Sequence, residues 1–388
     1  MALVVQKYGG TSVGTPERIE SVASQIKERV LKGDRLVVVV SAMMYTTDEL
    51  LSLAHSISDN PPEREVDMLL TAGERVSMAL LSIALWKLGV DAISFTGSQS
   101  GIITDNCHTR ARIVEIKPER IIGELEKGKV VIVAGFQGVS AGREVTTLGR
   151  GGSDTTAVAL ATAIGADVCE MYKNVPGVFT ADPSIIDEAK LHPAIPFEQM
   201  LDYAYFGADI VHPRAVELAW THNIKIIVRS SSRQGKETII REVQPMETPE
   251  ITGVSMRNNI IYFKFLLDNK GDELFRIFER ERINLDEVDM LRLGDDRYSL
   301  CFWVPDEKKE HLLHLLPGFN PDVRDDLSLV AVVGHNISWR AELVSDVMKI
   351  AADFPVERVK TTHTSITLLV EKNYAEKLAR KLHERLIR

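Results

Sequence analysis

The stretch Lys7-Tyr8-Gly9-Gly10-Thr11-Ser12 follows a short apolar segment at 3–5 and precedes Pro16-Glu17-Arg18, which predicts a helix start. Two adjacent glycines let backbone N–H groups approach a polyanion closely, and a helix N-terminus adds the positive end of its dipole. The stretch matches neither the Walker pattern nor the dinucleotide-binding pattern G-x-G-x-x-G. It therefore predicts either a phosphate-binding turn with its own lysine or a plain strand-to-helix connection. Motifs elsewhere in the chain are needed to distinguish these two interpretations.

The length and composition of the chain limit the classes of protein to which it can belong. A chain of 388 residues predicts two or three domains, and 45% hydrophobic with 26% charged residues is typical of soluble globular proteins. The net charge of −9 disfavours nucleic acid and anionic membranes as partners, so any bound anion must be held by local charge. No uninterrupted apolar run reaches membrane-span length and no signal peptide is evident, which predicts a cytoplasmic protein. Cys107, Cys169 and Cys301 are far apart, which favours free thiols.

The first 245 residues alternate short β-branched runs with longer helical periods. Strands are predicted at 3–6, 35–41, 92–96, 130–136, 168–171 and 224–228, and helices at 19–31, 65–88, 153–164 and 213–221. Runs that are apolar throughout, such as 36–40, indicate strands buried on both faces. The pattern therefore predicts an α/β fold with a mostly parallel sheet between helix layers, and polar glycine-bearing loops that converge on the carboxyl edge of that sheet.

A polar, proline-bearing segment at 244–250 predicts a domain boundary after a catalytic domain at 1–245. Beyond it, a strand–helix–strand–helix order occurs twice, with a period of roughly 65 to 70 residues. Strands are predicted at 260–267, 297–304, 327–333 and 364–370, with helices at 272–282, 307–315, 341–351 and 375–386. This repeat predicts two ferredoxin-like βαββαβ modules, at 251–320 and 325–388.

The most specific motif is Thr146-Thr147-Leu148-Gly149-Arg150-Gly151-Gly152-Ser153-Asp154, which runs into an apolar helix. An arginine, two glycines, a serine and an aspartate at one helix start are more than an N-cap requires. Weaker signals are Ser41-Ala42-Met43 with Thr46-Thr47, which a helix cap would also explain, and Gly73-Glu74, where a solvated helix glutamate is the ordinary interpretation. His212 before Pro213 reads as a turn residue, and no histidine spacing predicts a protein-bound metal.

Together, Lys7 to Ser12, Gly149 to Asp154 and Val175 to Pro183 resemble the aspartate kinases of the amino-acid kinase family. The order of the intervening motifs matches as well, so the resemblance covers nearly all of residues 1–235. It implies that the C-terminal modules are tandem ACT domains. The segment Thr361-Thr362-His363-Thr364-Ser365 is similar to the monofunctional Bacillus-type enzymes, which implies diaminopimelate or lysine as effector and a homodimer through the ACT modules.

The resemblance implies ATP-dependent phosphorylation of L-aspartate to 4-phospho-L-aspartate, the first step toward lysine, diaminopimelate, threonine and methionine. It assigns catalytic roles to Lys7 and Asp154, and Mg²⁺ would travel with the nucleotide, held by phosphates and water. The implied substrate-binding residues are Ser41, Thr47, Glu74, Arg150, Gly151, Gly152 and Ser153. The implied nucleotide-binding residues are Lys7, Tyr8, Gly9, Gly10, Ser12, Lys173, Asn174, Phe179, Asp182 and Asp209.

Three places in the catalytic region depart from the family pattern, and the effector loops depart as well. Lys173-Asn174 stands where Thr-Asp is usual, and Asp209 stands where a lysine is usual. Because the summed charge is unchanged, we hypothesise that the lysine function moved to Lys173, with Asp209 as its partner. Met44-Tyr45 replaces a glycine and a polar residue beside the substrate loop, and neither 268–272 nor 335–340 carries the usual proline-glycine of an effector loop.

Two other functions fit parts of the pattern. Kinases of acetylglutamate or UMP share the fold but lack the Gly149 to Asp154 and Gly73-Glu74 motifs in this order. A catalytically weakened sensor, which binds nucleotide and amino acid without turnover, would explain the substitutions at Lys173, Asn174 and Asp209. The presence of Lys7, Glu74, Arg150 and Asp154 favours the enzyme.

Overall fold

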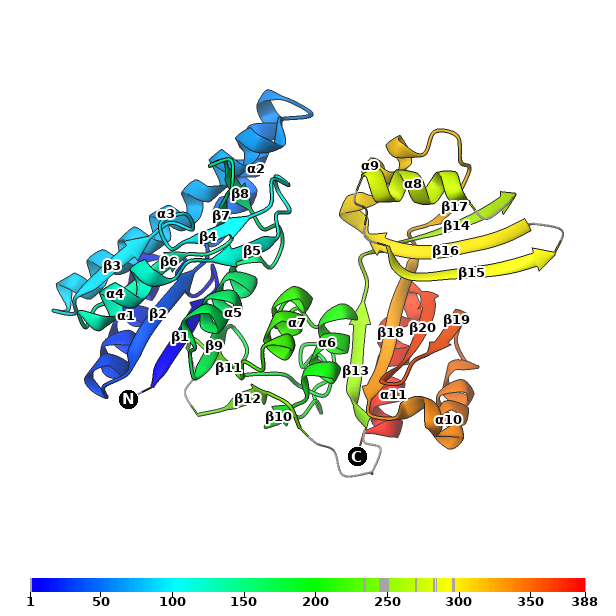
Figure 1. The fold of residues 1–388 in the computed structure, drawn as a ribbon. Coiled ribbons are helices and arrows are strands. Elements are labelled where there is room, and N and C mark those ends of the chain that lie inside the picture. Colours follow the sequence, from blue (N-terminus) through cyan, green and yellow to red (C-terminus); the bar gives the residue numbers. More distant parts are fainter. Residues whose placement is uncertain are drawn as a thin grey trace. The chain divides into compact units, whose positions relative to one another are not determined.

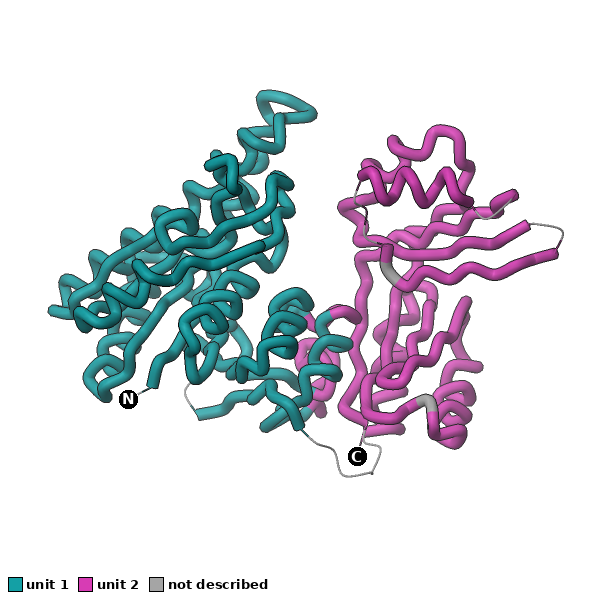
Figure 2. Tube along the Cα trace, in the orientation of Figure 1, with its two compact units in different colours: residues 1–179, 190–204, 209–246 teal, residues 180–189, 205–208, 247–388 magenta. Residues whose placement is uncertain are grey.

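A computed structural model of the chain describes residues 2–232, 235–243, 251–268, 271–281, 283, 285–294 and 297–387. The chain divides into two compact units, the first formed by residues 1–179, 190–204 and 209–246, and the second by 180–189, 205–208 and 247–388 (Figures 1 and 2). The predicted boundary segment at 244–250 lies outside the described residues.

The first unit is built on an eight-stranded sheet with the order β10-β12-β11-β9-β1-β2-β6-β3. Its strands are β1 (Leu3–Tyr8), β2 (Arg35–Val40), β3 (Ala92–Phe95), β6 (Val130–Ala134), β9 (Val168–Lys173), β10 (Ala194–Ile195), β11 (Ile226–Ser230) and β12 (Glu237–Ile240). Every pair in this sheet is parallel except β11 with β12, which confirms the predicted mostly parallel α/β fold.

The helices of the first unit are α1 (Pro16–Leu31), α2 (Thr46–Ile57), α3 (Glu63–Lys87), α4 (Glu119–Glu126), α5 (Gly152–Ile164), α6 (Phe197–Tyr205) and α7 (Pro213–Thr221). Helices α1 and α3 pack on the sheet face that carries Val4 and Tyr8. Alternation along β1 therefore turns Val5 and Lys7 to the other face, where α5 packs against β1. Helix α3 is long and apolar enough to span a membrane, but half of its most apolar window is buried, as in a core helix.

A second, smaller sheet in this unit has the order β5-β4-β7-β8, which sequence analysis did not predict. Its strands are β4 (Ile102–Thr104), β5 (Ile113–Ile116), β7 (Gln137–Ser140) and β8 (Val145–Thr147). They hold three or four residues each, too few for an alternating pattern to be recognised. Strand β8 leads directly into the glycine-rich turn before α5.

The second unit contains two four-stranded sheets, each with two helices on one face. One has β14 (Ile260–Asp268), β15 (Asp286–Gly294), β16 (Arg297–Pro305) and β17 (Asp322–Arg324) with α8 (Asp272–Arg280) and α9 (Lys309–Leu315). The other has β13 (Ile251–Arg257), β18 (Leu327–Gly334), β19 (Val356–Thr361) and β20 (Ser365–Glu371) with α10 (Ala341–Ala351) and α11 (Lys372–Leu386). Both sheets fit the predicted ACT-type modules.

The modules are nested, whereas sequence analysis predicts consecutive modules at 251–320 and 325–388. Strand β13 precedes the first module in sequence but pairs antiparallel with β18 of the second. Two short segments from the catalytic region also pack in this unit: Val254 N–H donates to the Thr180 carbonyl at 2.8 Å, and the Ser255 hydroxyl donates to the Phe206 carbonyl at 3.0 Å. The pairing of β13 spans more than 70 residues, a distance at which local patterns carry no information.

Candidate active site

Two lysines share one buried carboxylate at the carboxyl end of the large sheet. Lys7 Nζ lies 2.7 Å from Asp154 Oδ1, and Lys173 Nζ lies 2.9 Å from Asp154 Oδ2. Strands β1 and β9 are parallel neighbours with Lys7 beside Met171, so Lys173, two residues later, faces the same side. Asp154 reaches both lysines from the first turn of α5.

The charges of this group are set by burial and by each other. Burial alone would raise the pKa of Asp154, but the ammonium groups of Lys173 and Lys7 hold that pKa well below its usual range. Burial lowers the pKa of Lys7, and Asp154 opposes that shift. Asp154 is therefore an ionised carboxylate that keeps two cations in place, and the group as a whole carries one surplus positive charge.

Lys173 does not pair with Asp209, so that part of the hypothesis is wrong. Its ammonium donates to both oxygens of Asp154, whereas Asp209 is exposed at the turn before α7. Asp154 accepts in addition from the His212 backbone N–H at 3.3 Å. The partner of Lys173 is thus an acid from the motif that already holds Lys7.

The turn after β1 packs tightly against the turn after β2. A side chain at Gly10 would place its Cβ 2.6 Å from the Ala42 carbonyl oxygen, and the Met44 N–H donates to the Gly10 carbonyl at 3.2 Å. Gly9 lies beside Lys7, with 3.7 Å between a built Cβ and Nζ. Close backbone approach thus requires glycine at position 10, whereas the lack of a side chain at Gly9 leaves the space beside the Lys7 ammonium unfilled.

The turn before α5 uses glycine for two different reasons. Gly149 and Gly151 have φ of +74° and +71°, in the left-handed region, and a Cβ on Gly151 would lie 2.0 Å from Cγ of His212. Gly152 begins α5 and lies against Phe136. The first turn of α5, which carries Asp154, lies beside Lys7, and the positive end of the helix dipole adds to the positive charge there.

Glu74 on α3 is buried with half of its carboxylate unsatisfied. Its Oε1 accepts the Ala42 N–H at 3.1 Å, while its buried Oε2 has no hydrogen-bond partner. Burial raises the pKa of Glu74 to about 7, with Lys7 opposing the shift. A buried acceptor without a partner is costly, so this oxygen is suited to a cationic ligand group.

The remaining predicted residues occupy varied positions. Ser41 and Thr47 are half-buried in the turn after β2 and the first turn of α2, Ser153 is buried beside Gly135, and Arg150 is exposed. Tyr8 is the last residue of β1, and its ring stacks on Tyr172 in the core on the opposite sheet face, 4.4 Å between centroids. That ring is therefore not placed to bind nucleotide.

The predicted nucleotide-binding residues are distributed over both compact units. Asn174 accepts the Thr11 hydroxyl at 2.7 Å, and both border a cavity of about 620 Å³ with Ser12, whose buried hydroxyl has no partner. Phe179 forms an isolated antiparallel β-bridge with Leu191, and both residues belong to the first unit. Asp182 belongs to the second unit, where it accepts from the Ser184 backbone at 2.8 Å.

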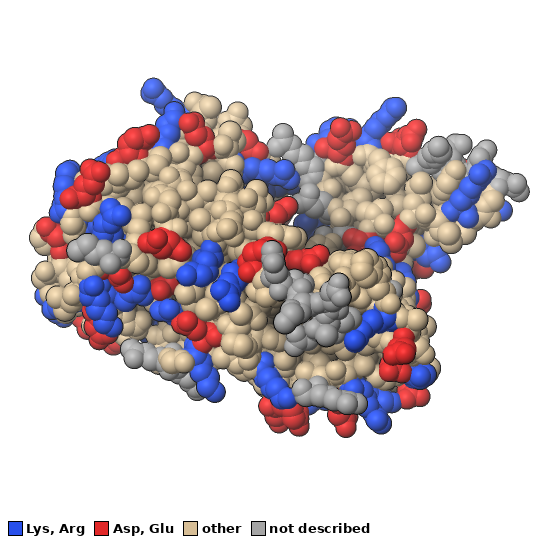
Figure 3. Space-filling model, turned by 60° about the horizontal axis from the view of Figure 1, so that its bottom comes forward, with Lys and Arg blue, Asp and Glu red and all other residues tan. Residues whose placement is uncertain are grey.

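Charge is otherwise distributed over the surface. On the face drawn in Figure 3, Lys and Arg side chains are interspersed with Asp and Glu. Within the described part of the chain, no group of three or more His, Cys, Asp or Glu side chains could hold a metal ion. The Lys7–Asp154–Lys173 group is thus a local concentration of positive charge in a protein of net charge −9.

Comparison with known proteins agrees with this architecture. The model of the amino acid kinase family matches residues 2–230. Aspartokinase 2 of Bacillus subtilis is 39% identical over 99% of this chain and 97% of its own, and the aspartokinase of Corynebacterium efficiens is 42% identical over 99% and 96%. Aspartokinase III of E. coli, solved with aspartate and ADP, shares the fold with a TM-score of 0.86 over both full chains, at 24% identity. The chain belongs to the amino acid kinase family, and within it to the aspartokinases.

Proposed function

We propose that this chain is an aspartate kinase, which transfers the γ-phosphoryl group of ATP to the side-chain carboxylate of L-aspartate. The observation that carries the proposal is the pair of lysines on Asp154, which lies in the first turn of α5. The triphosphate is a polyanion, and such a site neutralises it with fixed positive charge. ADP in a related solved structure supports nucleotide use.

The chemistry needs no general base. A carboxylate with a pKa of about 4 is already ionised at neutral pH. One of its oxygens attacks the γ-phosphorus, the bond to the β–γ bridging oxygen breaks, and ADP leaves with that electron pair. Lys7 stabilises the transferring phosphoryl group, and Gly9 and Gly10 offer backbone N–H groups to its oxygens. Lys173 neutralises the nucleotide phosphates, and Asp154 keeps both ammonium groups in position.

Mg²⁺ would accompany the nucleotide. Both oxygens of Asp154 already accept from lysine, so the acid nearest the phosphates is not a vacant metal ligand. Phosphate oxygens and water would hold the ion, as is usual for Mg²⁺ in kinases. Its contribution is to neutralise charge that develops on the phosphates.

The aspartate substrate would lie between α3 and the turn before α5. Glu74 Oε2 would accept from the α-ammonium, which completes the unsatisfied carboxylate, and Arg150 would pair with the α-carboxylate. The remaining polar atoms of the substrate would be bound by hydroxyl and backbone groups of Ser41, Thr47, Gly151, Gly152 and Ser153. This arrangement favours an enzyme over a sensor, because the side-chain carboxylate is then directed toward Lys7.

We also propose regulation by an amino acid at the second unit, and a homodimer formed through its sheets, in the cytoplasm. A cavity of about 890 Å³ in the first module is bordered by Asp268, Gly271, Asp272 and Glu273. Its acidic rim suits a diamino acid such as lysine or diaminopimelate. Thermal unfolding with lysine, diaminopimelate, threonine and methionine tests this: only a diamino acid should raise Tm, and a shift with threonine alone would contradict it.

The direct test of the activity is trapping of the acyl phosphate with hydroxylamine. Enzyme, ATP, Mg²⁺ and L-aspartate should give aspartyl hydroxamate in amounts equal to the ADP released. The Lys7→Ala variant should lose about 100-fold or more of this rate, since it removes a preorganised cation. Lys87→Ala, which removes an exposed lysine paired with Glu20, is the matched control. Nucleotide and aspartate binding without any hydroxamate would establish the sensor instead.

A further inference from the structure

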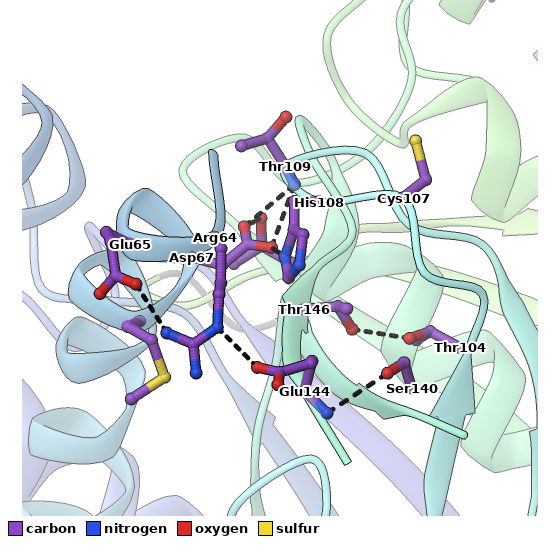
Figure 4. A network of polar contacts seen from close by, with 12 residues as sticks. Arg64, Glu65, Asp67, Thr104, Cys107, His108, Thr109, Ser140, Glu144 and Thr146 are labelled. Carbon is purple, nitrogen blue, oxygen red and sulfur yellow. Dashed lines mark hydrogen bonds and ion pairs between the residues drawn. The ribbon is translucent and has the colours of Figure 1, made fainter. Parts of the chain in front are cut away.

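Asp67 is a fully buried acid on α3 that sequence analysis did not single out. It lies two turns before Glu74 on the same helix, so α3 presents both acids to one side. Asp67 is 0% exposed, and its carboxylate is surrounded by donors from two distant segments. Figure 4 shows it between α3 and the loop that carries His108 and Thr109.

The donors around Asp67 come from the 105–112 loop and from the end of β8. Thr109 N–H donates to Asp67 Oδ1 at 3.0 Å, and His108 Nδ1 lies 2.6 Å from Oδ2. The Thr147 hydroxyl donates to Oδ1 at 2.6 Å. Thr109 itself has φ of +62°, an unfavourable conformation for threonine that needs such support.

Both segments adjoin the turn that carries Arg150. A Cβ on Gly149 would lie 3.0 Å from the Thr109 carbonyl oxygen, so the 105–112 loop borders this turn directly. Thr147 is three residues before Arg150. On the other side, Arg214 of α7 donates to the Leu148 carbonyl at 2.6 Å and to the Ala111 carbonyl at 3.2 Å, which ties the same two segments together.

We propose that Asp67 and Arg214 are positioning residues that fix the Gly149–Arg150 turn, and that Asp67 thereby sets the affinity for the substrate α-carboxylate. This inference rests on the proposed binding of aspartate by Arg150. Asp67 does not touch substrate. It acts by holding Thr109 and Thr147, and through them the backbone from which Arg150 projects.

The test is a binding cycle with Asp67→Asn, Arg150→Ala and the double variant. The Kd of L-aspartate, measured by calorimetry with ADP and Mg²⁺ present, should rise about 10- to 100-fold in Asp67→Asn, the loss expected for charge-assisted hydrogen bonds. The Kd of ADP should stay within about twofold. In the Arg150→Ala background, Asp67→Asn should have little further effect, because it acts through Arg150. Full additivity of the two changes on the logarithmic scale would overturn the proposal.

Two further variants separate positioning from loss of folding. Thr147→Val removes the hydroxyl that Asp67 accepts and should weaken aspartate binding, whereas Thr147→Ser keeps the hydroxyl and should bind as the native protein does. Glu144→Gln is the matched control: Glu144 pairs with Arg64 at 2.7 Å in the same region (Figure 4) and should leave both Kd values unchanged. Equal weakening by Thr147→Val and Thr147→Ser would contradict the positioning role. If the native protein itself fails to bind aspartate, the proposed function fails as well.

Discussion

Lys173 donates from its ammonium to both carboxylate oxygens of Asp154, at 2.9 and 3.2 Å. Lys7 occupies the same carboxylate at 2.7 Å, so two cations that would repel each other are held together by one acid. Lys173 therefore adds a second positive charge beside Lys7, at the place where we propose that the phosphates of the nucleotide bind.

Lys173→Ala should reduce kcat/KM for ATP by about 100-fold, because it removes one of the two fixed cations at the phosphates. Asp209→Ala should change it by less than about threefold, since Asp209 is exposed and makes no contact with Lys173. Steady-state kinetics of both single variants and the double variant measures this. Equal losses in the two single variants, with no further loss in the double, would restore Asp209 as the partner of Lys173.

Asp154→Asn should destabilise the free protein by about 3 kcal/mol, since it leaves the buried ammonium of Lys7 and the half-buried ammonium of Lys173 without their counter-ion. Chemical unfolding without nucleotide gives the free energy. Glu20→Gln, which breaks the exposed Lys87–Glu20 pair, is the control and should stay within about 0.5 kcal/mol of the native value. A loss no larger than that of the control would show that Lys7 and Lys173 do not depend on Asp154.

The buried carboxyl group of Glu74 should make the free energy of unfolding of the ligand-free protein depend on pH. Burial raises the pKa of Glu74 to about 7, above its unfolded value near 4.5. Its contribution to stability is therefore complete below about pH 4.5 and is lost as pH rises through about 7, on the order of 3 kcal/mol in all. Glu74→Gln should abolish this component, so the native protein and the variant should diverge between pH 5 and 8. Parallel curves would contradict the raised pKa.

The binding of aspartate should show the opposite dependence on pH. The α-ammonium requires an ionised Glu74, so the affinity of the native protein for L-aspartate should increase as pH rises from 6 to 8. Calorimetric titration over this range measures the effect. Glu74→Gln should bind aspartate more weakly and with little change over the same range; an identical slope in the variant would exclude Glu74 as the source.

Gly151→Ala should be more damaging than Gly165→Ala, although both glycines have left-handed φ. At Gly165 nothing lies within 4 Å of the added Cβ, so only backbone strain of about 1 kcal/mol is expected. At Gly151 the added atom lies 2.0 Å from the His212 ring, which must move. Thermal unfolding should give a clearly larger loss of Tm for Gly151→Ala; equal losses would show that His212 moves away at no cost.

Local patterns predicted the parts of the fold that local physics determines. The uninterrupted apolar run of β2 and the helix start at Gly152 are where the sequence placed them. That Lys173 and Lys7 share one carboxylate could not be predicted in the same way, because it depends on the parallel pairing of β1 with β9 across more than 160 residues. The joining of β13 to β18 is a long-range pairing of the same kind.

The motifs of the candidate site could be predicted from the sequence, but the residues that hold those motifs in position could not. Charged residues close to glycines indicated the site, as at Lys7, Glu74 and Asp154. Asp67 and Arg214 are isolated charges in helical periods, where a solvated side chain is the ordinary expectation. Only the tertiary structure shows that Asp67 is buried and that Arg214 reaches the Leu148 carbonyl.

In the mechanism that we propose, a side-chain carboxylate oxygen of L-aspartate attacks the γ-phosphorus of ATP at the Lys7–Asp154–Lys173 group. Aspartate with both side-chain carboxylate oxygens labelled with ¹⁸O, turned over in the presence of hydroxylamine, measures it. Hydroxylamine attacks the acyl carbon, so the released phosphate keeps the attacking oxygen. We expect mass spectrometry to find one ¹⁸O in each released phosphate. Unlabelled phosphate, released by attack of water on ATP, would contradict it.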